Sequence, residues 1–131
     1  MREAPLLVLV VDDEEAVVFV LQSWFERRLP PSEFEYEFCG VRTFDSALAL
    51  LQTRSNDIAL AILDQDLKSG ESKTGNQLAL CCEELGVPYG RYVANPATIE
   101  GHEGRFVLIK ACSEVWHVVD EAKKALQEEA A

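Results

Sequence analysis

Three aliphatic runs in this 131-residue chain each end abruptly at a charged side chain. Continuous aliphatic runs are typical of parallel strands that are covered on both faces. The predicted strands that contain these runs are 6–11, followed by Asp12 and Asp13; 57–63, followed by Asp64; and 106–109, followed by Lys110. Because the carboxyl ends of parallel strands lie at one edge of a sheet, we expect these charged groups to share one pocket.

The segments around these runs alternate between helical and extended patterns. The predicted helices are 14–29, 44–51, 76–85 and 115–126, and two further strands are predicted at 33–39 and 91–94. Thr43 and Ser113 are typical helix caps, and Pro30-Pro31 should end the first helix. Regular alternation of strand and helix predicts a doubly wound α/β fold with a parallel sheet. At this length we expect a single domain over residues 1–131.

Two loops depart from the regular pattern. Only ten residues, 96–105, separate the last two predicted strands, and they include Pro96, Gly101 and Gly104. A full helix with two connections normally needs more residues, so we expect the fourth helix to be shortened or replaced by a loop. The long polar loop after Asp64 carries Lys68 and Lys73, which we expect to be solvated, although they could face an acidic partner.

Composition excludes several classes of function. Twelve Lys and Arg residues against 23 Asp and Glu give a net charge of −11, which repels phosphate backbones, so we expect no nucleic-acid partner. Cys39, Cys81, Cys82 and Cys112 form no CxxC pair and have apolar neighbours, which indicates reduced cysteines in the cytosol. No segment approaches the ~20 apolar residues that span a bilayer. We therefore expect a cytoplasmic protein without a membrane partner.

The charged strand ends favour phosphoryl chemistry. Carboxylate oxygens are ligands that Mg²⁺ prefers, and a lysine ammonium suits phosphoryl oxygens. Each motif also has a plainer interpretation. The acidic pair could cap the following helix, Asp64-Gln65-Asp66 could be an ordinary acidic turn, and Lys110 could cover an edge of the sheet. Their joint position at matching strand ends favours a site.

Taken together, these residues resemble the receiver domains of two-component response regulators, such as the stand-alone chemotaxis receiver, over nearly the whole chain. Val-Val-Asp-Asp-Glu at 10–14 is similar to the acidic pair after the family's first strand, which places that pair at Asp12 and Asp13. Leu-Asp at the end of the third strand matches the phosphoacceptor, Asp64. Leu-Ile-Lys at the end of the fifth strand matches the family lysine, Lys110.

The resemblance implies a five-stranded sheet in the flavodoxin-like order 2-1-3-4-5. It also implies a phosphorelay function, in which a phosphohistidine on a histidine kinase or phosphotransfer protein gives its phosphoryl group to Asp64. Mg²⁺ would be held by Asp13, Asp64, the backbone carbonyl of Asp66 and, through a water, Asp12. Lys110 would hold the remaining phosphoryl oxygens. Such a chain is a signalling phosphoprotein that assists its own phosphorylation and dephosphorylation, not an enzyme, and it acts through a downstream protein partner or as part of a longer protein.

Three features depart from the family pattern. Receivers carry Ser or Thr at the end of the fourth strand, where this chain has Ala94 or, in the adjacent register, Asn95, whose amide could donate a hydrogen bond. The family's proline after the lysine is Ala111. The loop after Asp64 is about three residues longer than the corresponding loop of most receivers. These departures put the usual readout of phosphorylation in doubt.

Two other functions remain as alternatives. A degenerate receiver would keep the fold as a phosphorylation-independent interaction module, which the missing Ser or Thr supports. A phosphatase of the haloacid dehalogenase type is suggested by Asp64-Gln65-Asp66, which imitates that family's Asp-x-Asp. The order of motifs disfavours the phosphatase, because that family places Asp-x-Asp on its first strand and the acidic pair later.

Overall fold

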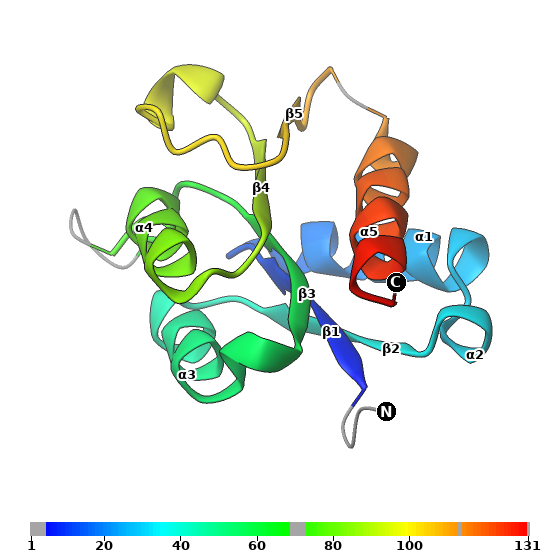
Figure 1. Cartoon of the computed structure of the whole chain (residues 1–131). Coiled ribbons are helices and arrows are strands. Elements are labelled where there is room, and N and C mark those ends of the chain that lie inside the picture. Colours follow the sequence, from blue (N-terminus) through cyan, green and yellow to red (C-terminus); the bar gives the residue numbers. More distant parts are fainter. Residues whose placement is uncertain (1–4, 69–72, 113, 131) are drawn as a thin grey trace.

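The computed structural model describes residues 5–68, 73–112 and 114–130 (Figure 1). Within these residues there are ten helices and strands and two short 3-10 turns. They are β1 (Leu6–Val11), α1 (Glu15–Arg28), α2 (Pro31–Phe34), β2 (Tyr36–Val41), α3 (Phe44–Arg54), η1 (Ser55–Asp57), β3 (Ile58–Leu63), α4 (Gly75–Leu85), β4 (Tyr89–Val93), η2 (Pro96–Thr98), β5 (Val107–Ile109) and α5 (Val115–Ala130).

The strands form one parallel sheet in the order β2-β1-β3-β4-β5. This confirms the predicted doubly wound fold and its strand order. β1 and β3 lie in the interior of the sheet, and every residue of both strands is buried. That burial accounts for their continuous aliphatic sequences, because neither face of these strands meets water.

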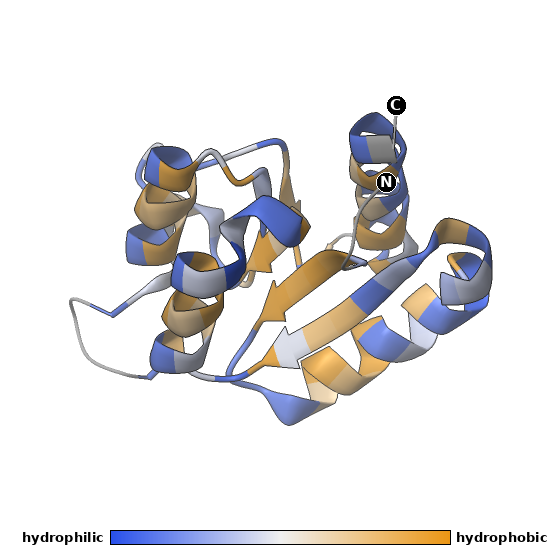
Figure 2. Ribbon diagram, turned by 60° about the horizontal axis from the view of Figure 1, so that its bottom comes forward, coloured by the Kyte–Doolittle hydropathy of each residue, from blue (hydrophilic) through white to orange (hydrophobic). Residues whose placement is uncertain are grey.

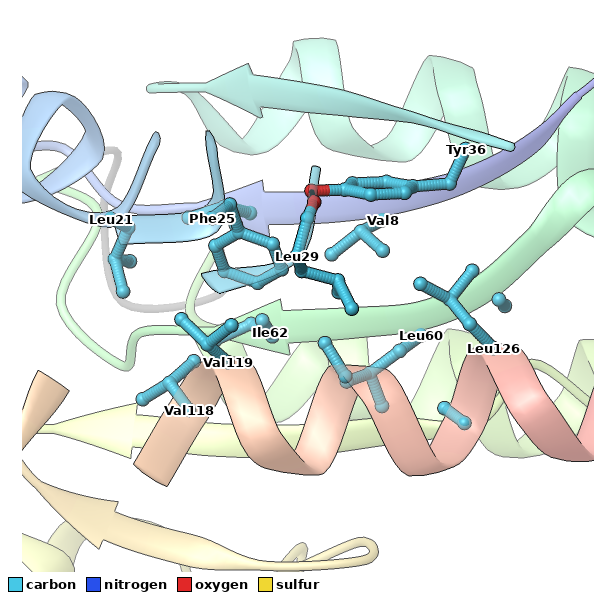
Figure 3. Packing of buried hydrophobic residues seen from close by; sticks show 14 of the residues in the cluster. Val8, Leu21, Phe25, Leu29, Tyr36, Leu60, Ile62, Val118, Val119 and Leu126 are labelled. Atoms are coloured by element: carbon cyan, nitrogen blue, oxygen red, sulfur yellow. Dashed lines mark hydrogen bonds between the residues drawn. The ribbon is translucent and has the colours of Figure 1, made fainter. Parts of the chain in front are cut away.

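Helices cover both faces of the sheet and divide the core into two layers (Figure 1). On one face α1 and α5 pack against alternate residues of β1 and β3. Figure 3 shows Phe25 of α1 and Leu29, the residue after this helix, in the same layer as Val119 of α5. On the other face α3 and α4 cover the remaining residues of the same strands. The central strands are accordingly hydrophobic along their length, whereas the helices alternate hydrophobic and hydrophilic residues (Figure 2). Each large aliphatic side chain buried in this way contributes about 1.5–3 kcal/mol.

The second strand begins later than predicted. Residues 33 and 34 belong to the short helix α2, and β2 begins at Tyr36. Pro31 stands at the first helical position, where its fixed φ favours a helix, and Glu35 ends the turn with a left-handed φ of 49°. The alternation of Phe and Glu in this region predicted a strand, but at residues 33 and 34 that prediction was wrong, because a helical turn that begins at Pro31 includes them.

The fourth strand is shifted toward the N-terminus relative to the prediction. It begins at Tyr89 and ends at Val93, so Ala94 lies just beyond it. The remaining predicted helices and strands agree with the structure to within a few residues at each end. Thr43 caps α3 as predicted, because its side-chain oxygen accepts a hydrogen bond from the Ser46 amide at 3.1 Å. The other predicted cap, Ser113, lies outside the described residues.

The connection between β4 and β5 contains η2 in place of a full helix, as the short spacing predicted. The four cysteines are free. Within the described parts of the chain, no helix is both long enough and apolar enough to cross a membrane.

Candidate functional site

The carboxyl edge of the sheet gathers the three predicted strand ends. Val11 pairs with Leu63 in the parallel register, so Asp12 and Asp64, the next residues along β1 and β3, leave the sheet side by side. The Asp64 amide donates a hydrogen bond to the Val11 carbonyl at 3.0 Å, which continues this register by one residue. Lys110 follows β5 on the same edge. The sequence-based prediction that these groups meet is thus confirmed.

A single ammonium group lies between two buried carboxylates. Lys110 Nζ is 2.6 Å from Asp12 Oδ2 and 3.1 Å from Asp64 Oδ2. Asp12 is only 2% exposed and Asp64 only 6%. The other oxygen of each carboxylate accepts a local backbone hydrogen bond, from the Glu14 amide at 3.0 Å and from the Gln65 amide at 2.8 Å. Both aspartates are therefore held in fixed orientations.

Burial and mutual repulsion perturb the proton affinity of this cluster. Burial, together with the charge of Asp12, raises the pKa of Asp64 to about 6, although Lys110 opposes this shift. Burial also raises the pKa of Asp12. For Lys110, burial lowers the pKa, but the hydrogen bond to Asp12 and the two carboxylate charges outweigh it and raise the pKa overall. The two buried carboxylates thus share the single ammonium of Lys110.

The acidic residues have the arrangement that a second cation would need. Asp12, Asp13 and Asp64 each present an oxygen, and these oxygens lie within 4.8 Å of one another. Asp13 Oδ2 is buried, and it accepts no hydrogen bond from the described residues. A hard divalent cation prefers carboxylate oxygens, so this donor set fits Mg²⁺.

Lys68 was expected to be solvated, but it reaches this cluster. Its Nζ lies 3.3 Å from Asp13 Oδ2 as an ion pair, while 73% of the Lys68 side chain stays exposed. Lys73 pairs with Asp45 at 3.3 Å. The two loop lysines are therefore exposed, as predicted, and they bind acidic residues of this same chain.

Two predicted site residues, Asp66 and Asn95, use their side chains outside the pocket, although the prediction for Asp66 concerned its backbone carbonyl. Asp66 is exposed, and its Oδ1 accepts a hydrogen bond from the Lys68 amide at 3.0 Å. Asn95 is also exposed, and its Oδ1 accepts from the Ala97 amide at 3.0 Å, which caps η2. Ala94 is exposed and offers only a methyl group. The end of β4 thus presents no side-chain hydroxyl, as the sequence indicated.

Sequence analysis missed one charged residue beside the site. Arg91 in the middle of β4 is fully buried, and its guanidinium contacts the backbone of Leu63 and Asp64. The available signal was a single charged side chain inside the otherwise uncharged segment Tyr89–Val93. Buried charges are rare unless they are paired or fully hydrogen-bonded, so such a residue points to a specific set of partners.

Solved receiver domains share this fold at low sequence identity. The signal receiver domain of an HD domain-containing protein from Pseudomonas fluorescens is similar with a TM-score of 0.73 and 21% identity, over 96% of this chain and 98% of that chain. A response regulator receiver protein from Sinorhizobium medicae gives a TM-score of 0.72 and 16% identity, over 95% and 96%. The receiver domain of a sensor histidine kinase from Pseudomonas aeruginosa, solved with a magnesium ion in its active-site cleft, gives 0.69 and 13%, over 95% and 99%.

No protein-family model and no curated protein matches the sequence significantly. The likeness is therefore one of structure, and it extends over 95% of the chain. The strand order 2-1-3-4-5, the flanking helices and the acidic cluster at the carboxyl edge agree with it. The chain has the fold of the response regulator receiver domains.

Proposed function

We propose that this chain is a phosphoacceptor receiver of a two-component or phosphorelay system, with Asp64 as the acceptor. The observation that carries the proposal is the cluster of Asp12 and Asp64 around one ammonium, beside the buried Asp13 Oδ2, which forms an ion pair with the exposed Lys68. In the reaction, an Asp64 oxygen attacks the phosphorus of a phosphohistidine. A P–O bond forms and the P–N bond breaks, and the imidazole nitrogen keeps the electron pair.

Each residue of the pocket has a separate role in this phosphoryl transfer. Asp64 must be ionised to attack, and with a pKa of about 6 it is mostly a carboxylate at neutral pH. Lys110 supplies positive charge to the phosphoryl oxygens, and its short contact with Asp12 fixes its position. Asp12, Asp13 and Asp64, together with the Asp66 carbonyl, would hold Mg²⁺. When bound, the ion neutralises the negative charge that otherwise keeps a carboxylate away from a phosphoryl group.

The phosphoryl donor in this proposal is a histidine kinase or a histidine phosphotransfer protein. Its approach is supported by the surface of α1 next to the pocket, where Phe19 and Val20 are 69% and 42% exposed. An apolar cavity of about 240 Å³ lies between Val20 and Lys110, with Tyr92 in its wall. Exposed apolar side chains of this kind are typical of protein–protein contact sites, and a donor protein bound here would have its histidine close to Asp64.

The direct test is incubation with Mg²⁺ and acetyl phosphate, followed by intact-mass measurement. We expect a mass increase of one phosphoryl group that disappears after Asp64→Asn and is retained after Asp66→Asn, because the Asp66 side chain is exposed and faces away. An unmodified mass under conditions that label an ordinary receiver would refute the proposal. Labelling that survives Asp64→Asn would refute the assignment of the acceptor.

A degenerate receiver is the second candidate. It is favoured by the end of β4, where Ala94 has no hydroxyl and the Asn95 oxygen already caps η2. The labelling experiment separates the two functions, because a degenerate receiver stays unmodified and binds its partner equally well with Asp64→Asn. A haloacid dehalogenase-type phosphatase is disfavoured. The Asp64-x-Asp66 motif follows β3, not the first strand, and the Asp66 carboxylate is engaged by the Lys68 amide.

A further inference from the structure

Arg91 has a complete set of partners although it is entirely buried. Its side chain is 0% exposed. A guanidinium has five N–H donors in a rigid fork, and here each finds an acceptor. The acceptors are the Leu63 carbonyl (3.3 Å), the Asp64 carbonyl (3.5 Å), Gln65 Oε1 (2.9 Å), Asn76 Oδ1 (2.8 Å) and the His102 carbonyl (2.8 Å). All five acceptors are uncharged groups. The hydrogen bonds of Arg91 therefore serve to fix the relative positions of several parts of the chain.

These five hydrogen-bond partners of Arg91 belong to three separate parts of the structure. The first part is residues 63–65, which we call the acceptor turn because it carries Asp64, the proposed phosphoacceptor. Asn76 stands in the first turn of α4, and His102 lies in the segment 95–105 between β4 and β5. The fork of Arg91 is therefore the point where the acceptor turn, the start of α4 and the segment 95–105 are joined.

Further hydrogen bonds tighten the same junction. Gln65 Oε1 accepts from the Asn76 amide at 2.9 Å, and the Gly75 amide donates to the Gln65 carbonyl at 2.9 Å. The side-chain amide of Asn76 donates to the Thr98 carbonyl at 2.8 Å. Asn76 thus contacts Arg91 with its oxygen and the segment 95–105 with its nitrogen. A displacement of the acceptor turn cannot leave these contacts unchanged.

The segment 95–105 is the least regular of the three parts. It contains one 3-10 turn, and Glu100 and Gly101 both have left-handed φ values, of 48° and 86°. Its middle is tied to the acceptor turn through Arg91–His102 and Asn76–Thr98. In Figure 1 it lies above α4 as a loop outside the sheet. Irregular segments with few regular hydrogen bonds open at low free-energy cost.

We propose that Arg91 is a positioning residue that couples the acceptor turn to the segment 95–105, so that this segment is the surface that reports the state of Asp64. The inference rests on the proposed function, because it needs a phosphoryl group or its mimic on Asp64. The physical reason is charge. A phosphoryl group on Asp64 adds negative charge beside the Asp64 backbone carbonyl, which Arg91 Nη2 contacts. The guanidinium of Arg91 is permanently charged, and because it is buried it cannot move into water. Its fork must then reorient relative to Asn76 and His102.

The test is amide NMR of the full chain with Mg²⁺ alone and with Mg²⁺ plus beryllofluoride, a phosphoryl mimic. In the wild-type chain we expect beryllofluoride to shift residues 63–68 and Lys110 and also residues 98–104. Asn76→Ala removes a contact to Arg91 and the contact to Thr98 without touching the pocket carboxylates. It should keep the pocket shifts and reduce those of 98–104 several-fold. Gln77→Ala, an exposed change in the same helix, should behave as wild type.

The variants Arg91→Met and Arg91→Lys test the role of the Arg91 guanidinium directly. Lys keeps the charge but lacks the planar fork, so both variants should lose the shifts of 98–104 while beryllofluoride still binds. If the Arg91 variants fail to fold, Asn76→Ala decides. Wild-type-like shifts of 98–104 in Asn76→Ala would overturn the inference. Pocket shifts without any change at 98–104 in the wild-type chain would overturn it and leave the proposed function standing. Absence of all shifts, together with no labelling by acetyl phosphate, would overturn both.

Discussion

Lys110 Nζ lies closer to Asp12 than to the proposed acceptor: the distances are 2.6 Å to Asp12 Oδ2 and 3.1 Å to Asp64 Oδ2. Asp12 is also the more deeply buried of the two carboxylates. The lysine is thus anchored by Asp12, and the Asp64 oxygen has the weaker hold on it. This arrangement suits a phosphoacceptor at Asp64. The Lys110 ammonium can contact the phosphoryl oxygens while its ion pair with the Asp12 carboxylate stays in place.

Lys110→Met should leave two buried carboxylates without their counter-charge. Breaking a buried ion pair by removing one partner costs roughly 3–5 kcal/mol. We expect such a loss in the free energy of unfolding at pH 7.5, measured by urea denaturation, and a smaller loss at pH 5, where the carboxylates can take up protons. Lys124→Met, which removes an exposed ion pair with Glu121, is the control and should change stability little. An equal loss at both pH values would contradict this account of Lys110.

The raised pKa of Asp64 predicts the sign of a stability change with pH. The folded protein holds a proton on Asp64 up to about pH 6, whereas the ordinary pKa is 3.8. The stabilisation by the protonated form is fully present below pH 3.8 and is lost as the pH rises through 6. Asp64→Asn cannot ionise. In metal-free buffer it should therefore be more stable than wild type at pH 7.5, by on the order of 1–3 kcal/mol, and the difference should shrink toward pH 4. A variant less stable than wild type at pH 7.5 would show that this sign is wrong.

Removal of Lys68 should strengthen Mg²⁺ binding. The Lys68 ammonium lies 3.3 Å from the Asp13 oxygen that accepts no hydrogen bond, so it competes with an ion for the same charge. Because the side chain is 73% exposed, we expect a modest effect: a Kd for Mg²⁺ that is about two- to fivefold lower in Lys68→Ala, measured by calorimetry. Lys73→Ala is the matched control from the same loop, since Lys73 pairs with Asp45 outside the pocket. Equal effects of both variants would mean that only overall charge matters.

Gly75 allows α4 to begin against the acceptor turn. A Cβ at this position would lie 1.7 Å from the Asp64 carbonyl oxygen and 2.7 Å from Arg91 Nη2. Gly75→Ala must therefore push the start of α4 away from the turn, because neither the backbone nor the buried guanidinium can yield easily. We expect a loss of about 1–3 kcal/mol in thermal or urea unfolding, and slower labelling of Asp64 by acetyl phosphate. Gln77→Ala, two residues along the same helix, should have neither effect.

Much of the fold and of the pocket could be predicted from local patterns. The aliphatic runs of β1 and β3 show the strands because strands buried on both faces need apolar residues at every position. Asp12, Asp64 and Lys110 could be placed together because the ends of parallel strands share one edge. The start of β2 could not be predicted in this way, since alternating Phe and Glu residues fit a strand while Pro31 favours a helical turn.

The sequence by itself determined which groups reach the carboxyl edge, because strand direction and side-chain type are local properties. Only the tertiary structure decided how these groups are connected. Lys68, in the loop after Asp64, meets Asp13 at the end of β1, the Asn95 side chain turns to cap η2, and Arg91 joins three parts of the chain. The contacts of Lys68 and Arg91 join segments far apart in the sequence, and no periodicity or spacing encodes them. A buried guanidinium acquires its role only when the fold supplies acceptors for every N–H.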